Sequence, residues 1–482
     1  MQTTFARTLS AALAVVMLAL AVSASDESLE TLLAYLKSPN VSTRRDAARK
    51  LGERRERNQL AVEALAVAAR KDDDREVRLE AVNALGKLKD FTALPDMLGA
   101  LRDPSDPVRH AAIKALVMLY TEHDIDFITN RRDGWNWFNP FLDTSDHAIV
   151  EPYIFVQPEI IQALGESARG DAVRDVRVSA IRALGVLRGT IAITQLADAL
   201  NADPDVRIDV IRAFIKIGDP AAGRYLIPFF RDSNQKVRTQ AMVAAGLLKY
   251  RPAVEPLLSV YGLGAEKRGT MAAVMHKVKG RFTYLPPRDE AALWALSLVG
   301  DDRAEQTFVE NMTDKDGDRR QYAFEGLARI GDSRYLDQVS RLVLTEGNND
   351  VKLAEYFALY KMGSRPNIQN IVRKLDTDQQ DQARAYLMEA RPADLFPHIR
   401  SSNRIVRQQV IDILGRIGDA DTIKELQPIA QTSGAETAEI AHLAIRRIEW
   451  RLSGRPRVHD PAMRRTSTSE TDAPRPRRAA NP

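Results

Sequence analysis

Apolar residues recur along most of the chain at the spacing of an α-helix, in short segments separated by polar turns. Val77, Ala81 and Leu85 are four residues apart and therefore share one face of a predicted helix. Gly218 and Gly331 are each followed by aspartate, a pair typical of a helix end joined to the start of the next helix. With 6% aromatic and 28% charged residues, the composition suits solvated helices better than a thick β core. The pattern predicts an all-α protein.

A repeated template runs through this helical pattern. An arginine is followed by alanine three residues later, by leucine seven residues later and often by glycine eight or eleven residues later. Most of the template is kept at Arg44, Arg78, Arg109, Arg177, Arg238, Arg320, Lys352 and Arg407, and Arg207 lies 30 residues after Arg177 and 31 before Arg238. The interval is 31 residues from Arg78 to Arg109 and 32 residues from Arg320 to Lys352. Such an interval has room for two helices and two turns.

Each repeat is therefore predicted to be a helical hairpin, with second helices at 191–200 and 221–230 among others. A hairpin of about 31 residues cannot bury its apolar face alone, so successive hairpins must stack. The sequence predicts an α-solenoid, a superhelix of about eleven helical hairpins within residues 25–452.

The segment from Asp205 to Pro220 resembles the short HEAT repeats of phycobilisome lyase subunits. The resemblance extends over roughly residues 29–450 and implies the same stacked fold. It implies no single activity, because repeats of this type serve scaffolds, chaperones and a few enzymes alike.

The period is broken between Arg109 and Arg177, which are 68 residues apart and leave an insert at about 120–158. Long inserts in compact folds are often functional. The insert holds large aromatic side chains among prolines, namely Trp135, Trp137, Phe138, Phe141, Tyr153 and Phe155. Two interpretations remain open: the aromatic side chains cap the core of the solenoid, or they form a partner-binding surface of the kind that Trp and Tyr dominate.

A second break separates Arg238 from the equivalent position at Asp289, 51 residues later, and leaves an insert at about 262–287. Its basic residues include Lys267, Arg268, Lys277, Lys279 and Arg281. The segment is either a solvated loop or a patch that binds an acidic protein, an anionic envelope polymer or a lipid headgroup. Few aromatic residues accompany the basic ones, which disfavours nucleic acid as a partner.

Residues 1–24 are typical of a signal peptide. Arg7 precedes an apolar run from Leu9 to Val22, and small residues follow. The run of about 14 residues is shorter than the roughly 20 that cross a bilayer as a helix, and no later segment is long and apolar enough. We therefore expect signal cleavage, a mature chain without a transmembrane segment, and a periplasmic or secreted location.

Residues 453–482 are rich in Pro, Ser, Thr and Arg, so we expect a disordered basic tail. Seven arginines and three acidic residues give the tail a charge of +4, which equals the net charge of the whole chain. The body therefore has no global field that would attract nucleic acid.

Sequence signatures of catalysis are missing. The chain has no cysteine, which excludes thiol nucleophiles, thiolate metal ligands and disulfides. None of the seven histidines is followed by glutamate, whereas iron-binding HEAT enzymes of the deoxyhypusine hydroxylase type, which have a similar fold, carry His-Glu pairs. No phosphate-binding loop, dinucleotide-binding glycine motif or nucleophile elbow occurs. We expect no enzyme activity, no catalytic residue, no metal and no cofactor.

These observations predict an exported repeat scaffold that binds a protein partner or an envelope polymer through its concave face and its inserted loops. An alternative is an accessory or lyase-like chaperone subunit that assists an enzyme or an envelope complex. A permanent subunit of an envelope machine would differ from the scaffold only in the lifetime of its complex.

Overall fold

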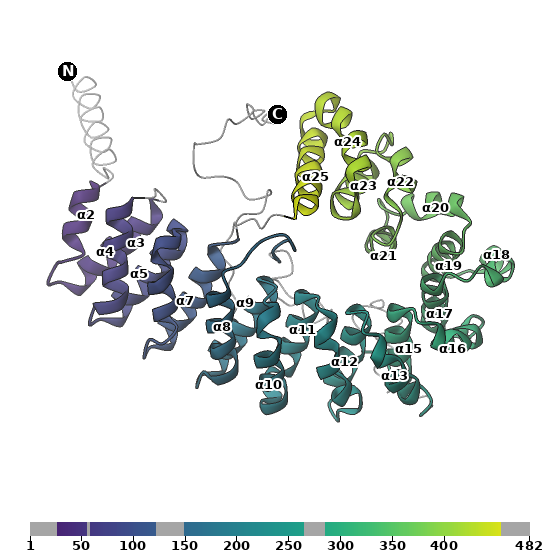
Figure 1. Cartoon of the computed structure of the whole chain (residues 1–482), viewed down its shortest axis with the longest axis horizontal. Coiled ribbons are helices and arrows are strands. Elements are labelled where there is room, and N and C mark those ends of the chain that lie inside the picture. Colours follow the sequence, from purple (N-terminus) through teal and green to yellow (C-terminus); the bar gives the residue numbers. More distant parts are fainter. Residues whose placement is uncertain (1–26, 55–57, 122–148, 265–284, 455–482) are drawn as a thin grey trace, which may run out of the picture. The chain divides into compact units, whose positions relative to one another are not determined.

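The computed structural model describes residues 27–54, 58–121, 149–264 and 285–454. These residues form α-helices and short 3-10 helices, and no β-strand occurs among them (Figure 1). Successive helices pack as hairpins that stack on one another, so the predicted all-α solenoid is confirmed. The chain separates into two compact units, Met1–Leu119 and Tyr120–Pro482, called here the first and the second unit.

The described part of the first unit is built from two rows of helices. Helices α3, α5 and α7 pack one against the next, and α4 and α6 pack beside them. The elements are α2 (Leu29–Tyr35), α3 (Val41–Glu53), α4 (Gln59–Lys71), α5 (Arg75–Leu88), η1 (Phe91–Ala93), α6 (Leu94–Ala100) and α7 (Asp106–Met118).

The second unit also has two rows, and Figure 1 shows them following a curve with α10, α16 and α18 on the outside. The inner row consists of α9 (Arg174–Val186), α11 (Arg207–Ile217), α12 (Gln235–Leu247), α15 (Arg288–Val299), α17 (Gly317–Ile330), α19 (Asn349–Lys361), α21 (Gln380–Leu387), α23 (Arg404–Ile417) and α25 (Ala435–Ser453). The outer row consists of α8 (Pro158–Gly170), α10 (Ile193–Ala202), α13 (Val254–Tyr261), α16 (Glu305–Asn311), α18 (Leu336–Thr345), α20 (Ile368–Val372), α22 (Pro392–Leu395) and α24 (Ala420–Thr432). Short 3-10 helices join them: η4 (Thr190–Ala192), η5 (Pro204–Val206), η8 (Arg251–Ala253), η10 (Asp302–Ala304), η11 (Ser333–Tyr335), η12 (Arg365–Asn367) and η13 (Phe396–His398).

One expected helix has a different form. The predicted α-helix at 221–230 is instead two 3-10 helices, η6 (Pro220–Tyr225) and η7 (Ile227–Arg231). A proline at 228 lacks the N–H that an α-helix would use there, and its ring obstructs the preceding turn. The backbone at Gly223 also passes so close to the next repeat that an added Cβ would lie 2.3 Å from the ring of Tyr250.

Small residues of the template set the distance between stacked repeats. Ala81, three residues after Arg78, is completely buried. Gly86, eight residues after Arg78, faces the next helix so closely that an added Cβ would lie 2.8 Å from the Cα of Ala115. Gly415 makes the same approach to Ala444, with 2.9 Å to its Cα. The alanine and glycine of the template are therefore packing residues.

The arginine that starts the template links several repeats to the next one. Arg78 donates from Nη1 to the carbonyl of Asp72, 2.9 Å away in its own turn, and from Nε to the carboxylate of Asp103, 2.7 Å away in the following turn. We call this series the arginine ladder, and its ion pairs are Arg44–Asp72, Arg78–Asp103, Arg177–Asp203, Arg207–Asp232 and Arg320–Glu346.

The ladder carboxylates accept hydrogen bonds both from the arginine of the preceding repeat and from the backbone of their own turn. Asp72 accepts from the guanidinium of Arg44 and from the backbone N–H of Asp74. Burial alone would raise the pKa of Asp72, but these hydrogen bonds and the nearby arginines hold the pKa below its usual value. The ladder therefore favours the charged carboxylate and fixes the turn between the two helices.

Candidate binding surface

The ladder is interrupted between α19 and α23. Lys352 stands where the template has arginine, and Glu355 stands where it has the buried alanine. Thirty residues after Lys352, Gln382 occupies the next starting position and donates to the carbonyl of Asp350 instead of reaching forward. Ser401 occupies the place of the ladder aspartate, six residues before Arg407. The repeats from α19 to α23 therefore replace residues that form the ladder elsewhere.

Two inner-row helices on either side of α19 contact each other directly in this region. Arg329, near the end of α17, donates to Glu389, which follows α21, over 2.9 Å. The Tyr386 hydroxyl of α21 donates to Glu325 of α17 over 2.7 Å. Helices two repeats apart approach each other only on the concave side of a curved stack. These contacts therefore place Glu325 and Arg329 on the inner surface.

The same cluster contains stacked aromatic rings under charged groups. The rings of Phe357 and Tyr386 are 4.3 Å apart and nearly parallel. The Arg329 guanidinium lies 5.7 Å from the centroid of Phe357, and Lys361 Nζ lies 6.0 Å from it on the same α19 helix. Arg329 is 8% exposed and also donates to the carbonyl of Ser297 over 2.9 Å. The result is a rigid platform with Lys361 at its rim.

Lys249 adds a titratable cation to this platform. It follows α12 with a left-handed backbone, φ 53°, and its Nζ donates to the carbonyl of Leu298 over 2.5 Å. Although the residue is exposed overall, the surrounding helices remove water from its ammonium group. This burial, together with repulsion from Arg329, lowers the pKa of Lys249 to about 8. The charge of this part of the surface therefore changes near neutral pH.

A second inner-row cluster, which we call the clasp, joins the start of the described second unit to its last helix. Val150 donates its N–H to the carbonyl of Val186 at the end of α9 over 2.9 Å. The next residue, Glu151, has Oε1 3.6 Å from Arg416 of α23 and 3.4 Å from Arg447 of α25. The rings of Tyr153 and Trp450 meet edge to face at 5.8 Å. The segment 149–157 thus contacts both α9 and α25.

Only two of the aromatic residues predicted as a site are within the described chain. Tyr153 is half-buried in the clasp, whereas Phe155 is 42% exposed. The other predicted site residues lie outside the described residues: Trp135, Trp137, Phe138, Phe141, Lys267, Arg268, Lys277, Lys279 and Arg281.

The inner-row clusters lie outside the sites that the sequence predicted, although a signal for them is present. Lys216, Arg329, Lys361 and Arg416 each follow a template start by nine residues. Arg447 is their counterpart on α25, because Ala444, which faces Gly415, fixes the register of the two helices. We call these five residues the basic stripe. The apolar and small positions of the repeat determine the fold, whereas the basic stripe belongs to the inner row.

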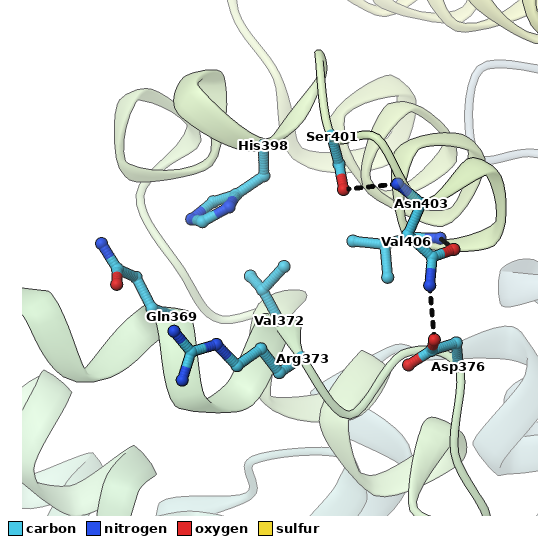
Figure 2. Close-up of a pocket in the computed structure, with 8 residues that line it drawn as sticks. All are labelled: Gln369, Val372, Arg373, Asp376, His398, Ser401, Asn403 and Val406. Atoms are coloured by element: carbon cyan, nitrogen blue, oxygen red, sulfur yellow. Dashed lines mark hydrogen bonds between the residues drawn. The ribbon is translucent and has the colours of Figure 1, made fainter.

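A polar cavity opens where the ladder is interrupted. Its volume is about 370 Å³, and it is lined by Gln369, Val372, Arg373, Asp376, His398, Ser401, Asn403 and Val406. Figure 2 shows the polar ends of Gln369, Arg373 and His398 directed into one open space. At the other end of the cavity, the side-chain amide of Asn403 donates a hydrogen bond to the carboxylate of Asp376 over 2.5 Å. Burial lowers the pKa of His398. The groups suit hydrogen bonding to a polar ligand, and no nucleophile is paired with a base among them.

A second cavity, of about 540 Å³, borders both ends of the basic insert. Its lining is acidic and includes Asp289, Glu290, Asp314 and Asp316. Asp289 forms an ion pair with Arg319 of α17. The cavity therefore presents carboxylates that already interact with the protein.

The described residues contain no group of three or more His, Asp or Glu side chains that could hold a metal ion. Among the helices that the structure describes, none has both the length and the apolar character needed to cross a bilayer.

Comparison with known proteins places similar repeats in this chain. A family model of HEAT repeats matches residues 62–137 and 161–246. Phycocyanobilin lyase subunit alpha of Nostoc sp. is 28% identical over 245 residues, which are 47% of this chain and 86% of that protein. The solved complex of CpcE and CpcF of phycocyanin lyase from Nostoc sp. aligns at 19% identity over 69% of this chain and 93% of that chain, with a TM-score of 0.24. Kap121p aligns at 13% identity over 89% of this chain and 50% of its own, with a TM-score of 0.38.

Proposed function

Because this chain is a HEAT-repeat protein, we propose that it is a non-catalytic scaffold that holds a protein partner against the inner row of its second unit. One observation carries the proposal. Lys249, Lys361 and Arg329 gather beside the buried, stacked rings of Phe357 and Tyr386, and positive charge on such a rigid surface is complementary to an acidic protein face.

The expected partner has an acidic face. Lys249 and Lys361 lie at the rim of the platform, where charges steer a partner and fix its register. The buried groups beneath them, Arg329 and Phe357, keep the platform rigid, which lowers the entropic cost of binding. An anionic envelope polymer would be attracted by the same charges, so it is the competing outcome of the test below.

We also propose that the scaffold is exported. The apolar run from Leu9 to Val22 supports signal cleavage near residue 24 and a periplasmic or secreted location. N-terminal sequencing of the mature protein and fractionation of the cells test this. A chain that keeps Met1 and stays in the cytoplasmic fraction contradicts it.

A second candidate is an accessory, lyase-like subunit that assists an enzyme. The 28% identity to phycocyanobilin lyase subunit alpha favours this candidate. It predicts that the partner recovered with the scaffold is an enzyme or a second repeat subunit. A scaffold without this accessory role could bind a protein of another kind.

The test reverses two rim charges and asks whether the partner is lost. We expect the double variant Lys249→Glu and Lys361→Glu to recover at least about tenfold less partner from envelope extracts than the wild type. The matched control is Lys424→Glu on outer helix α24, where the side chain is 75% exposed. Circular dichroism of all three proteins checks that they are folded.

Full recovery of every partner by the double variant would contradict the proposal. Recovery of polysaccharide or lipid instead of protein, lost in the same variant, would replace the protein partner with an envelope polymer.

A further inference from the structure

The clasp carries an excess of positive charge. Arg416 and Arg447 form ion pairs with Glu151, and Arg188 and Arg451 interact electrostatically with the same carboxylate. Asp412 of α23 is the other acidic group of the clasp, and it pairs with Arg447 over 3.0 Å and with Arg384 of α21. Five arginines therefore surround two carboxylates, which leaves three positive charges uncompensated.

The clasp arginines are also less well paired than those of the ladder. In the ladder, Arg78 reaches both oxygens of Asp103 at 2.7 and 3.1 Å. In the clasp, Glu151 approaches no closer than 3.4 Å, and the buried Nε of Arg447 has no hydrogen-bond partner. A buried donor without an acceptor costs free energy comparable to a lost hydrogen bond. The clasp arginines can therefore form more hydrogen bonds than the described chain provides acceptors for.

Backbone carbonyls hold the remaining clasp arginines in place. Arg188 donates from Nε to the carbonyl of Val150 over 2.8 Å, and Arg451 donates to the carbonyl of Arg416 over 2.7 Å. Carbonyl groups orient a guanidinium without neutralising it. Burial lowers the pKa of both Arg188 and Arg451, in keeping with charge that lacks a full counterion.

We infer that the clasp is a binding site for a polyvalent oxyanion, a phosphate-bearing group above all. Guanidinium groups match the geometry of phosphate oxygens, and several of them converge here from the end of α9, from α23 and from α25. Arg416 is 38% exposed, so the ligand reaches the cluster from solvent through this residue. The clasp shares no residue with the platform of Lys249, Arg329, Phe357, Lys361 and Tyr386, so the anion and the protein partner would bind at different places.

Binding at this site should hold the second unit closed. The oxyanion would bridge Arg188 on one side of the clasp and Arg416 and Arg447 on the other. Without it, the positive charges on the two sides repel each other. A ligand that binds only the closed, folded state raises its apparent stability with a saturable dependence on ligand concentration. Monovalent salt only screens the repulsion and shows no saturation at a defined site.

The experiment uses the full mature chain and inorganic pyrophosphate as the probe. Thermal unfolding and isothermal titration calorimetry are measured in sodium pyrophosphate and in sodium chloride at equal ionic strength. We expect a saturable rise in Tm and a one-to-one binding isotherm with pyrophosphate alone. The variant Arg416→Gln should weaken binding at least about tenfold, since it removes an exposed guanidinium, whereas Glu151 and Asp412 keep their ion pairs with Arg447. The control Arg400→Gln removes an arginine that is 65% exposed and precedes the start of α23, whereas Arg416 lies at the end of that helix, and it should bind as the wild type does.

Two further results identify the source of the phosphate group. Co-sedimentation with phosphatidylglycerol vesicles that is lost in Arg416→Gln assigns the site to a lipid headgroup. Binding of pyrophosphate without binding of vesicles assigns it to a soluble or polymer-borne phosphate. Equal Tm in pyrophosphate and chloride, or pyrophosphate binding that is unchanged in Arg416→Gln, overturns the inference.

Discussion

The most specific prediction concerns Glu355, because its carboxyl group occupies a position where other repeats have a buried alanine. It lies three residues after Lys352, where Ala81 and Ala180 are fully buried in other repeats, and it is itself 1% exposed. Its Oε2 has no hydrogen-bond partner. Burial, and then repulsion from Glu346, raise the pKa of Glu355 to about 8, whereas Lys352 offsets only part of this.

The sign of the pH dependence follows from this raised pKa. Between about pH 4.5 and 8 the folded chain keeps a proton on Glu355 that the unfolded chain releases. Stability therefore falls as pH rises through this window and levels off above the folded pKa. At about 1.4 kcal/mol per pKa unit, the free energy of unfolding is about 3 kcal/mol lower at pH 7 than below about pH 4.5, and about 5 kcal/mol lower above pH 8. The variant Glu355→Gln has a similar shape and no charge to bury, so it escapes this loss.

Urea unfolding followed by circular dichroism at pH 5 and pH 8 measures the effect. We expect Glu355→Gln to be within about 1 kcal/mol of the wild type at pH 5 and more stable by about 3 kcal/mol or more at pH 8. The control Glu439→Gln, exposed on α25, should change stability by no more than about 0.5 kcal/mol. A Glu355→Gln variant that is equally stable or less stable at pH 8 refutes the reasoning, because it would mean that the carboxylate is satisfied when charged.

Other predictions test the repeat packing, the ladder and the first insert. Gly415→Val should destabilise the protein by about 2 kcal/mol, since the added atoms meet the backbone of α25, and calorimetry would detect it. Arg78→Met should cost about 3 kcal/mol in urea unfolding, because it strands the part-buried carboxylate of Asp103; an unchanged midpoint would mean that the ladder contributes no stability. Joint replacement of Trp135 and Trp137 by alanine should cost about 2 kcal/mol of partner affinity per residue with an unchanged Tm if they bind a partner, or about 3 kcal/mol or more of stability each if they cap the core. A variant that melts normally and keeps every partner excludes both roles.

Local pattern sufficed to predict the helical hairpins. The spacing of Arg78, Ala81 and Gly86 describes contacts within one helix and with the next one, so it recurs wherever the repeat recurs. The same local signals included Gly223 and Pro228, which explain why the predicted helix at 221–230 is two 3-10 helices. Apolar spacing alone predicts an α-helix there, but the proline prevents it.

The inner-row clusters could not be predicted in the same way. Arg329 meets Glu389 sixty residues later, and Glu151 meets Arg447 at the far end of the second unit. Such contacts depend on curvature, which accumulates from small rotations between repeats and is not encoded in any single repeat. The exceptional Glu355, in contrast, is visible in the sequence as a charge in the alanine position.

The central claim is that a partner binds the inner row of the second unit, and site-specific photo-crosslinking tests it most directly. Leu247 ends inner helix α12 and lies nine residues after Arg238, in the register of the basic stripe, and it is 43% exposed. Leu344 is 80% exposed on outer helix α18 and serves as the matched control. With a photoreactive amino acid at each position in turn, we expect a discrete crosslinked protein from position 247 and none from position 344. Crosslinks from position 344 alone, or from neither position while the partner still co-purifies, would contradict binding on the inner row.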